Sequence, residues 1–265
     1  MASAGDGDTP VRAPSLWRFL AEGRAAGELA TTVALRPLLR RLSRGDGHPV
    51  LLLPGFLASD LSTRPLRRFL RDLEYWAHRW RLGRNLGPQN GLERRLEERL
   101  GEVAERHGRR VSLVGWSLGG LYARLLANRF PERIRCVISL GSPFNGHRKA
   151  NNSWRLYEWI TDERLDEIPD ERLAMVRATP PCPTTSVFSR TDGITAWQCS
   201  VEPEGPRAES IEIPGSHLGL GFNPLALYVI ADRLAQPERG WQPFFRPGRR
   251  HPPGIRRPPE AVRAG

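Results

Sequence analysis

Cysteine is scarce in this sequence. The chain contains three cysteines, Cys136, Cys182 and Cys199, with no Cys-x-x-Cys pair and no Cys/His spacing typical of zinc. We therefore expect no metal. Cys136 lies in an apolar, strand-like run and is predicted to belong to the core. Cys182 and Cys199 flank one strand and turn, so the sequence leaves open whether they pair; two ordinary thiols in a reducing compartment are the favoured interpretation.

Long apolar runs are also absent. No uninterrupted stretch reaches the ~18 apolar residues that a membrane-spanning helix needs. The first fourteen residues carry Asp6, Asp8 and two prolines where a secretory signal would have an apolar core. These absences predict a cytoplasmic protein with a flexible N-terminus over residues 1–14.

Lysine is almost missing, although the chain is strongly basic. The formal net charge is +11, yet Lys149 is the single lysine and arginine supplies the other basic residues. Residues 246–265 hold six arginines and one glutamate, so much of the excess charge lies near the end of the chain. This bias fits genome composition better than a binding surface, and we expect no nucleic-acid partner. Residues 241–265, basic and rich in proline, are predicted to form a disordered tail.

Residues 15–44 have the pattern of an amphipathic helical segment. Arginines accompany an apolar side that comprises Leu16, Phe19, Leu20, Leu29, Val33, Leu38 and Leu39. Two interpretations stay open. A basic amphipathic helix can rest on a membrane surface, which predicts peripheral membrane contact through residues 15–42. Packing of the helix on its own domain or on a partner is the favoured alternative.

Strand-like and helix-like segments alternate between residues 45 and 240. Short apolar runs at 50–53, 75–80, 110–114, 134–140, 184–189 and 210–214 predict strands, and the patterns at 63–73, 92–108, 120–128 and 223–234 predict helices. This βαβα order indicates one α/β domain over residues 45–240, with a mostly parallel central sheet flanked by helices. Ligands of such domains bind at the carboxyl ends of the strands.

Residues 143–183 interrupt this order and are predicted to form a small helical cap or lid. Trp154, Leu156, Tyr157 and Trp159 fall on one short helix, and a second helix spans about 170–178. The aromatic side chains either line a substrate cleft or only pack against their neighbours, and the sequence favours neither alternative.

The run Gly115-Trp116-Ser117-Leu118-Gly119 fits the pattern G-x-S-x-G and stands between a predicted strand and a predicted helix. In a nucleophile elbow of this kind the serine occupies a tight turn, and small neighbours let strand and helix approach closely. The helix N-terminus also offers free N–H groups to a developing oxyanion. Ser117 is therefore the candidate nucleophile.

A serine nucleophile needs a base and a group that orients the base. Among six histidines, His217 alone sits in a glycine-rich loop after a late strand. Asp192 follows the strand before it, which fits the chain order Ser…Asp…His. Two N–H donors complete an acyl-transfer site: that of Leu118, directly after the serine, and that of Phe56, after Gly55 in the loop behind the first strand.

Five motifs together resemble the α/β-hydrolase superfamily and, within it, the bacterial triacylglycerol lipase/esterase group. They are Leu-Leu-Pro-Gly-Phe at 52–56, Gly-Trp-Ser-Leu-Gly-Gly at 115–120, Gly-Ser-Pro-Phe at 141–144, Ser-Arg-Thr-Asp-Gly at 189–193 and Gly-Ser-His at 215–217. The resemblance covers about residues 48–236. It implies an eight-stranded type of sheet, Ser117 as nucleophile, Asp192 as orienting acid, His217 as base, and Phe56 with Leu118 as the oxyanion pair. It also implies no metal and no organic cofactor.

The chain departs from that group in two ways. Many of its lipases carry His-Gly in the oxyanion loop, whereas this chain has Pro54-Gly55. Many are secreted, whereas this chain has no visible export signal. Both departures bear on the type of substrate that the resemblance implies more than on the reaction that it implies.

These patterns predict a serine hydrolase that cleaves carboxylic esters of small molecules or lipids through an acyl-enzyme. One alternative is an acyltransferase, in which an alcohol or amine replaces water. A further alternative is a non-catalytic member of the superfamily that binds or scaffolds. Acyl-chain length and oligomeric state are left open by the sequence.

Overall fold

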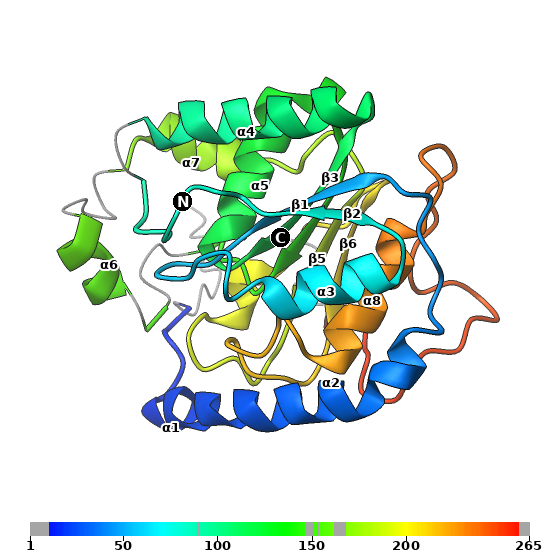
Figure 1. Ribbon diagram of the computed structural model, residues 1–265. Helices are drawn as coiled ribbons and strands as arrows, with labels where there is room; N and C mark the ends of the chain where they lie inside the picture. Colours follow the sequence, from blue (N-terminus) through cyan, green and yellow to red (C-terminus); the bar gives the residue numbers. More distant parts are fainter. Residues whose placement is uncertain (1–10, 89–90, 147–150, 153, 162–167, 260–265) are drawn as a thin grey trace, which may run out of the picture.

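The structure is a computed structural model that describes residues 11–88, 91–146, 151–152, 154–161 and 168–259. A parallel sheet of six strands in the order β2-β1-β3-β4-β5-β6 forms its centre (Figure 1). The strands are β1 (Pro49–Leu53), β2 (Trp76–His78), β3 (Val111–Trp116), β4 (Ile134–Leu140), β5 (Thr184–Phe188) and β6 (Ala208–Glu212). Every neighbouring pair runs parallel, which confirms the predicted α/β fold. The resemblance implied an eight-stranded type of sheet; the described residues contain six of these strands.

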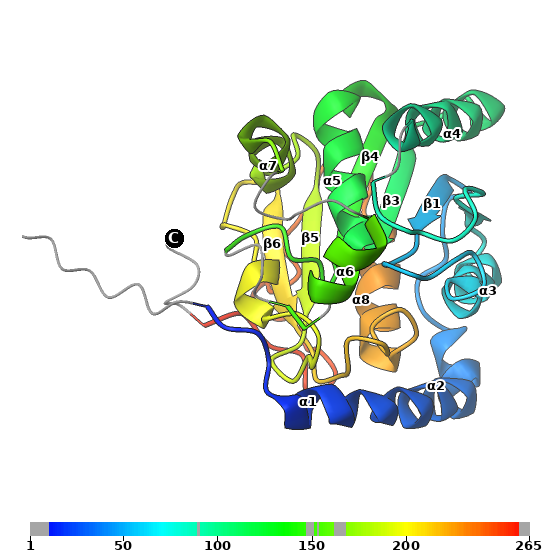
Figure 2. The ribbon, with the colours of Figure 1, turned by 90° about the vertical axis from the view of Figure 1, so that its left-hand side faces the viewer.

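Helices cover both faces of the sheet (Figure 2). Helices α4 (Leu92–His107) and α5 (Leu118–Arg129) pack on one face, and α3 (Arg64–Asp72) and α8 (Pro224–Leu234) pack on the other. Strand side chains alternate between these two cores, so Leu51 joins the α4–α5 core while Leu52 joins the α3–α8 core. Burial on both faces explains why the central strands are apolar at nearly every residue.

Local rules set the ends of several helices. The Asn223 side chain accepts hydrogen bonds from the N–H groups of Leu225 and Ala226 and so caps α8, with Pro224 in the first turn. Helix α4 ends at Gly108, which adopts the left-handed conformation with φ 57°. Both ends agree with the predicted boundaries. Two 3-10 turns, η2 (Pro131–Arg133) and η4 (Trp197–Ser200), lie in the connections.

The N-terminal segment forms α1 (Leu16–Leu20), the 3-10 turn η1 (Ala21–Arg24) and α2 (Ala25–Leu39), which run along the bottom of the molecule beside α8 (Figures 1 and 2). Leu39 of this segment is buried in the α3–α8 core, and polar side chains make further contacts with the domain. Arg36 forms an ion pair with Asp72 at 2.9 Å, and the Thr32 hydroxyl donates to the Phe222 carbonyl. The segment therefore packs on its own domain through polar side chains and Leu39, and most of its large apolar side chains remain exposed.

Residues 241–259 differ from the predicted disordered tail. Phe244 is completely buried in the core that contains α8. Its N–H donates to the Glu209 carboxylate at 2.7 Å, and Arg256 pairs with Glu212 of β6 through backbone hydrogen bonds. Proline and arginine dominated the composition, but the apolar residues between them dock this segment on the domain. Residues 260–265, and residues 1–10 of the predicted flexible N-terminus, lie outside the described residues.

The predicted cap segment, 143–183, contains α6 (Trp154–Thr161) and α7 (Asp170–Arg177). Arg124 of α5, fully buried, donates to the carbonyls of Val176, Arg177 and Ala178 at the end of α7. The same guanidinium forms an ion pair with the buried Glu202. The cap is thus anchored to the helix that follows the candidate nucleophile. Residues 147–150, 153 and 162–167 lie outside the described part.

All three cysteines are buried and free. Burial raises the pKa of Cys182 to about 12 and that of Cys199 to about 11, so both are thiols at neutral pH. Within the described residues, we find no helix that combines the length and apolar character needed to span a bilayer.

Candidate active site

Ser117 stands in a strained turn between β3 and α5. Its backbone has φ 52° and ψ −121°, a conformation that non-glycine residues rarely adopt. The turn is close because its neighbours lack side chains: a Cβ on Gly119 would clash with the Leu53 carbonyl, and one on Gly115 would clash with the backbone of Gly119 and Gly120. The Ser117 N–H donates to the Leu140 carbonyl at 2.8 Å. Ser117 therefore occupies a tight turn between strand and helix.

The two predicted oxyanion donors lie beside this turn. The loop after β1 approaches so closely that a Cβ on Gly55 would come within 3.2 Å of the Ser117 Cβ. Within the described structure, the N–H groups of Phe56 and Leu118 donate to no acceptor. Leu118 is the first residue of α5, whose N-terminus carries a partial positive charge. Both amides are thus available to a negatively charged oxygen.

Asp192 and His217 form a buried pair. The His217 Nδ1 and the Asp192 Oδ2 lie 2.6 Å apart, and the two residues are 4% and 3% exposed. The other oxygen of Asp192 accepts the N–H groups of Ile194 and Thr195 at 2.8 and 2.7 Å. These bonds fix the carboxylate, which in turn orients the imidazole.

The pKa of His217 is raised above its ordinary value. Burial alone would lower the pKa, but the charge of Asp192, the hydrogen bond to it and the charge of Glu22 outweigh burial. A neutral Nδ1–H that donates to Asp192 leaves Nε2 as an acceptor for a proton. The imidazole can therefore act as a base, and its imidazolium form is stabilised.

Direct contacts join the serine turn to the histidine loop. The Trp116 Nε1–H donates to the His217 carbonyl at 3.0 Å. Gly141, directly after β4, has φ +55°, and a Cβ there would lie 3.1 Å from the His217 Nδ1 and 3.3 Å from the Asp192 Oδ2. The fold thus brings Ser117, Asp192 and His217 to the carboxyl ends of β3, β5 and β6, where α/β sheets bind ligands.

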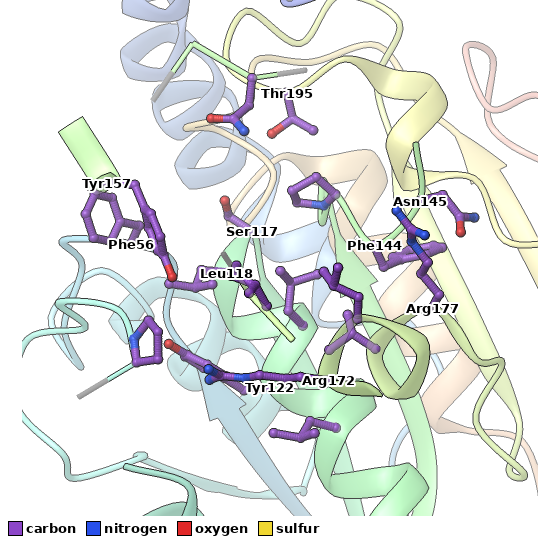
Figure 3. A pocket seen from close by; sticks show the side chains of 18 of the residues that line it. Phe56, Ser117, Leu118, Tyr122, Phe144, Asn145, Tyr157, Arg172, Arg177 and Thr195 are labelled. Atoms are coloured by element: carbon purple, nitrogen blue, oxygen red, sulfur yellow. The ribbon is translucent and has the colours of Figure 1, made fainter. Parts of the chain in front are cut away.

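A mainly apolar pocket opens at Ser117 (Figure 3). Side chains from α5, α7 and the loop after β4 line it, together with two aromatic rings, Phe56 and Tyr157, whose centroids lie 5.4 Å apart. Trp154 and Tyr157 of the predicted cap belong to this lining, which favours the cleft over simple packing for these two residues. The site can therefore hold an apolar group against the serine.

Comparison with known proteins agrees with the observed fold. A family model described as the alpha/beta hydrolase fold matches residues 106–173, which include the Ser117 turn. A serine hydrolase of Mus musculus, BPHL, is 29% identical over 133 residues, or 46% of this chain and 44% of that protein. The chain has the α/β-hydrolase fold. Less than half of the curated relative's length is matched.

Solved structures share the fold of this chain. Aspergillus fumigatus lipase B superposes with a TM-score of 0.53 at 17% identity, covering 73% of this chain and 55% of that one. A structure from work on the metagenome-derived lipolytic enzymes LipS and LipT gives a TM-score of 0.52 at 16% identity, covering 72% and 93%. The monoacylglycerol lipase of Paleococcus ferrophilus gives 0.52 at 14% identity, covering 72% and 96%. At these identities the likeness concerns the fold.

Two residues that shape the candidate site were not predicted from the sequence. Asn85, 1% exposed, donates from its side chain to the Pro54 carbonyl at 2.8 Å, and its backbone bonds to Leu57 and Ala58 hold the loop of Phe56 in place. Glu22, 4% exposed, reaches the loops of Asp192 and His217 from the N-terminal segment. No local pattern marks either residue, because their partners are distant in the chain.

The described part of the chain contains no group of three or more His, Cys, Asp or Glu side chains that could hold a metal ion. His48, the other fully buried histidine, has a structural environment. Its ring nitrogens lie 2.5 Å from the Asp46 carboxylate and 2.8 Å from the Ser112 hydroxyl. Burial, the largest influence, lowers the His48 pKa to about 4, so the ring is neutral at pH 7.

Proposed function

We propose that this chain is a serine hydrolase that cleaves carboxylic esters through an acyl-enzyme, with Ser117, His217 and Asp192 as its catalytic residues. One observation carries the proposal: Ser117 occupies a strained turn at an apolar pocket, beside two unused amide N–H groups, in a fold that also pairs His217 with Asp192. Strain of this kind persists only where the surrounding structure holds it, and such sites are often functional.

The residues account for each transfer in the reaction. The Nε2 of His217 removes the proton from the Ser117 hydroxyl, and the serine oxygen forms a bond to the ester carbonyl carbon. The N–H groups of Phe56 and Leu118 stabilise the negative carbonyl oxygen. The C–O bond to the alcohol then breaks, and the imidazolium returns its proton to that alcohol. Water, deprotonated by His217, then attacks the acyl carbon. The C–O bond to Ser117 breaks, the imidazolium returns the proton to the serine oxygen, and the carboxylic acid is released.

The pocket supports an ester with an apolar acyl group. Leu121 and Leu125 of α5, Phe144 and Val176 contribute apolar surface next to Ser117. Burial of each methylene of an acyl chain stabilises the complex by about 0.8 kcal/mol when the contact excludes water. We therefore place the chain with the lipase/esterase-like enzymes, in agreement with the motifs that it shares with the bacterial triacylglycerol lipase/esterase group.

The serine can be tested directly. Ser117→Ala is expected to reduce kcat/KM for p-nitrophenyl esters by about 10⁴-fold or more, because it removes the atom that forms the acyl bond. Labelling by a fluorophosphonate probe should disappear in parallel. The control is Ser43→Ala, which changes an exposed serine after α2. Full labelling of the Ser117→Ala protein would overturn the proposal.

We further propose that the exposed side of the segment α1–η1–α2 contacts an anionic lipid surface. Leu16, Trp17 and Leu20 are 70%, 81% and 61% exposed, and Leu29, Val33, Leu35 and Leu38 continue the exposed apolar side along α2. Among the seven arginines of residues 11–44, Arg12, Arg18 and Arg41 are exposed and form no ion pair within the described structure. Apolar side chains flanked by positive charge match the chemistry of an anionic bilayer.

Vesicle binding tests this contact. The protein should sediment with vesicles of phosphatidylcholine and phosphatidylserine, bind less to phosphatidylcholine alone, and lose binding when Trp17→Ser and Leu20→Ser are combined. High salt should weaken binding because charge attraction is screened. A protein that ignores both kinds of vesicle contradicts the proposal. Self-association that the same substitutions abolish would assign the surface to a second copy of the chain.

A further inference from the structure

Glu22 is a buried carboxylate outside every motif of the sequence. It lies in η1 and is only 4% exposed. In the described part of the chain, no Arg, Lys or His forms an ion pair with it. Three backbone N–H groups take the place of such a partner: Gly193 at 2.8 Å and His217 at 3.0 Å donate to Oε1, and Leu218 at 2.8 Å donates to Oε2. A buried carboxylate is costly unless it is bonded in this way.

The three donors belong to the two loops that carry the candidate acid and base. Gly193 directly follows Asp192 in the loop after β5, whereas His217 and Leu218 lie in the loop after β6. One carboxylate therefore spans both loops. Because charge-assisted hydrogen bonds are stronger than neutral ones, this bridge restricts how far the loops can move relative to each other.

Two further residues of the N-terminal segment, Arg24 and Glu28, form hydrogen bonds with the same loops. Arg24 donates to the carbonyls of Thr191 and Gly215 at 2.6 and 2.8 Å, and the Glu28 Oε1 accepts the Ser216 N–H at 2.7 Å. The approach is close because Gly193 and Gly219 lack side chains: a Cβ on Gly193 would clash with the Arg18 carbonyl, and one on Gly219 with the Glu28 carboxylate. The loops and the segment are thus fitted to each other by several independent contacts.

We propose that Glu22 is a positioning residue, which holds the backbone of His217 and the loop of Asp192 in the arrangement that the imidazole needs to act as a base. The inference rests on the proposed function. Glu22 is not part of the pocket lining, so it acts through His217 and not on the substrate. The N-terminal segment accordingly helps to position the catalytic loops.

The charge of Glu22 has a measurable consequence. The charged groups that face the imidazole are Asp192, from the loop after β5, and Glu22, from η1; Arg24 and Glu28 reach its loop through the backbone. Both carboxylates raise the pKa of His217. A neutral residue at position 22 should therefore lower that pKa, and the acid limb of kcat/KM, which follows the free base, should move to lower pH.

Two substitutions separate charge from hydrogen bonding. Glu22→Gln keeps one acceptor oxygen and turns an NH₂ group toward one of the donors, whereas Glu22→Ala removes all acceptors. We expect kcat to fall about tenfold for Gln and about a hundredfold for Ala, with KM nearly unchanged, because misplacement of a catalytic group by ~1 Å has effects of this size. The acid limb should shift to lower pH in the Gln variant.

Glu209→Gln is the matched control. Glu209, with a side chain 12% exposed, also accepts a backbone N–H, that of Phe244. It is the second residue of β6 and lies near the end of the strand opposite the His217 loop. This variant should lose stability without any change in the acid limb or in kcat. Thermal unfolding of every variant shows how much of each protein is folded.

The outcomes distinguish the two proposals. The pKa of His217 is followed by NMR in full-length wild type and in Glu22→Gln, a readout that needs no turnover. A wild type that neither cleaves esters nor reacts with the fluorophosphonate refutes the proposed function. A wild type that reacts, together with folded Glu22 variants of unchanged kcat, acid limb and His217 pKa, overturns the role of Glu22 alone.

Discussion

At the scale of single residues, the site depends on positions where a side chain is excluded. Gly141 illustrates this: it follows β4 with φ +55°, and a Cβ would lie 2.7 Å from Leu220, 3.1 Å from the His217 Nδ1 and 3.3 Å from the Asp192 Oδ2. The residue therefore combines a left-handed backbone with direct proximity to the histidine–aspartate pair.

Gly141→Ala should lower kcat/KM about a hundredfold, because the new methyl group displaces the imidazole. The left-handed backbone adds a stability cost of about 1–2 kcal/mol. Gly83→Ala is the control: Gly83 has φ +80°, but nothing lies within 4 Å of its added Cβ. Ester kinetics and urea unfolding of both variants separate the two effects. Equal kcat/KM values for Gly141→Ala and Gly83→Ala would contradict the prediction that a methyl group at position 141 displaces the imidazole.

The residues proposed for catalysis were predictable, and the ones that position them were not. Ser117 lies in a contiguous motif. Asp192 and His217 each follow a strand, so the predicted strand ends reduce the number of candidates for the acid and the base. Glu22 and Asn85 lack such a signal, because a glutamate in a helical segment and an asparagine in a loop are usually solvated. Their burial arises from partners that are distant in the chain.

At the scale of elements, the sequence predicted where most helices and strands lie, because hydrophobic periodicity and helix caps are local. β4 and the end of α4 agree with the predicted limits, while β2 is shorter than predicted and covers Trp76–His78. An edge strand with one neighbour has fewer hydrogen bonds to extend it.

The orientation of the N-terminal segment could not be predicted in this way. An amphipathic pattern normally directs the apolar side to the core. Here Glu22, Arg24 and Glu28 face the domain, because the loops near Asp192 and His217 present N–H and carbonyl groups there. Leu39 is buried in the core, but most of the large apolar side chains are left outside, which is the basis for the proposed contact with a lipid surface.

At the scale of the whole molecule, the buried His48 and the half-buried His78 make the fold sensitive to acid. Burial, with the charge of Arg135 adding to it, lowers the pKa of His48 to about 4. Burial and the charge of His107 lower the pKa of His78 to about 4. The pKa of His217 is raised and works in the opposite sense. Because the pKa values of His48 and His78 are strongly lowered and only that of His217 is raised among these three, we expect a net loss of stability in acid.

The free energy of unfolding is therefore expected to fall as pH decreases from 6.5 towards 4. Above this window both states hold neutral His48 and His78; within it the unfolded chain binds protons that the folded chain does not. Urea unfolding at about pH 7.5 and about pH 5 measures the change. The fall should be smaller in His78→Gln. Equal stability of the wild type at both pH values would contradict this assignment.

The sequence by itself determined the α/β order, the serine turn and the strand ends that carry Asp192 and His217, since each depends on residues that are close in the chain. Only the tertiary structure decided that the segment before the sheet grips the loops of the acid and the base, and that residues 241–259 dock on the core. These contacts join residues up to 196 positions apart, as Glu22 and Leu218 are. No local pattern encodes such pairs, because the folded sheet and its covering helices bring them together.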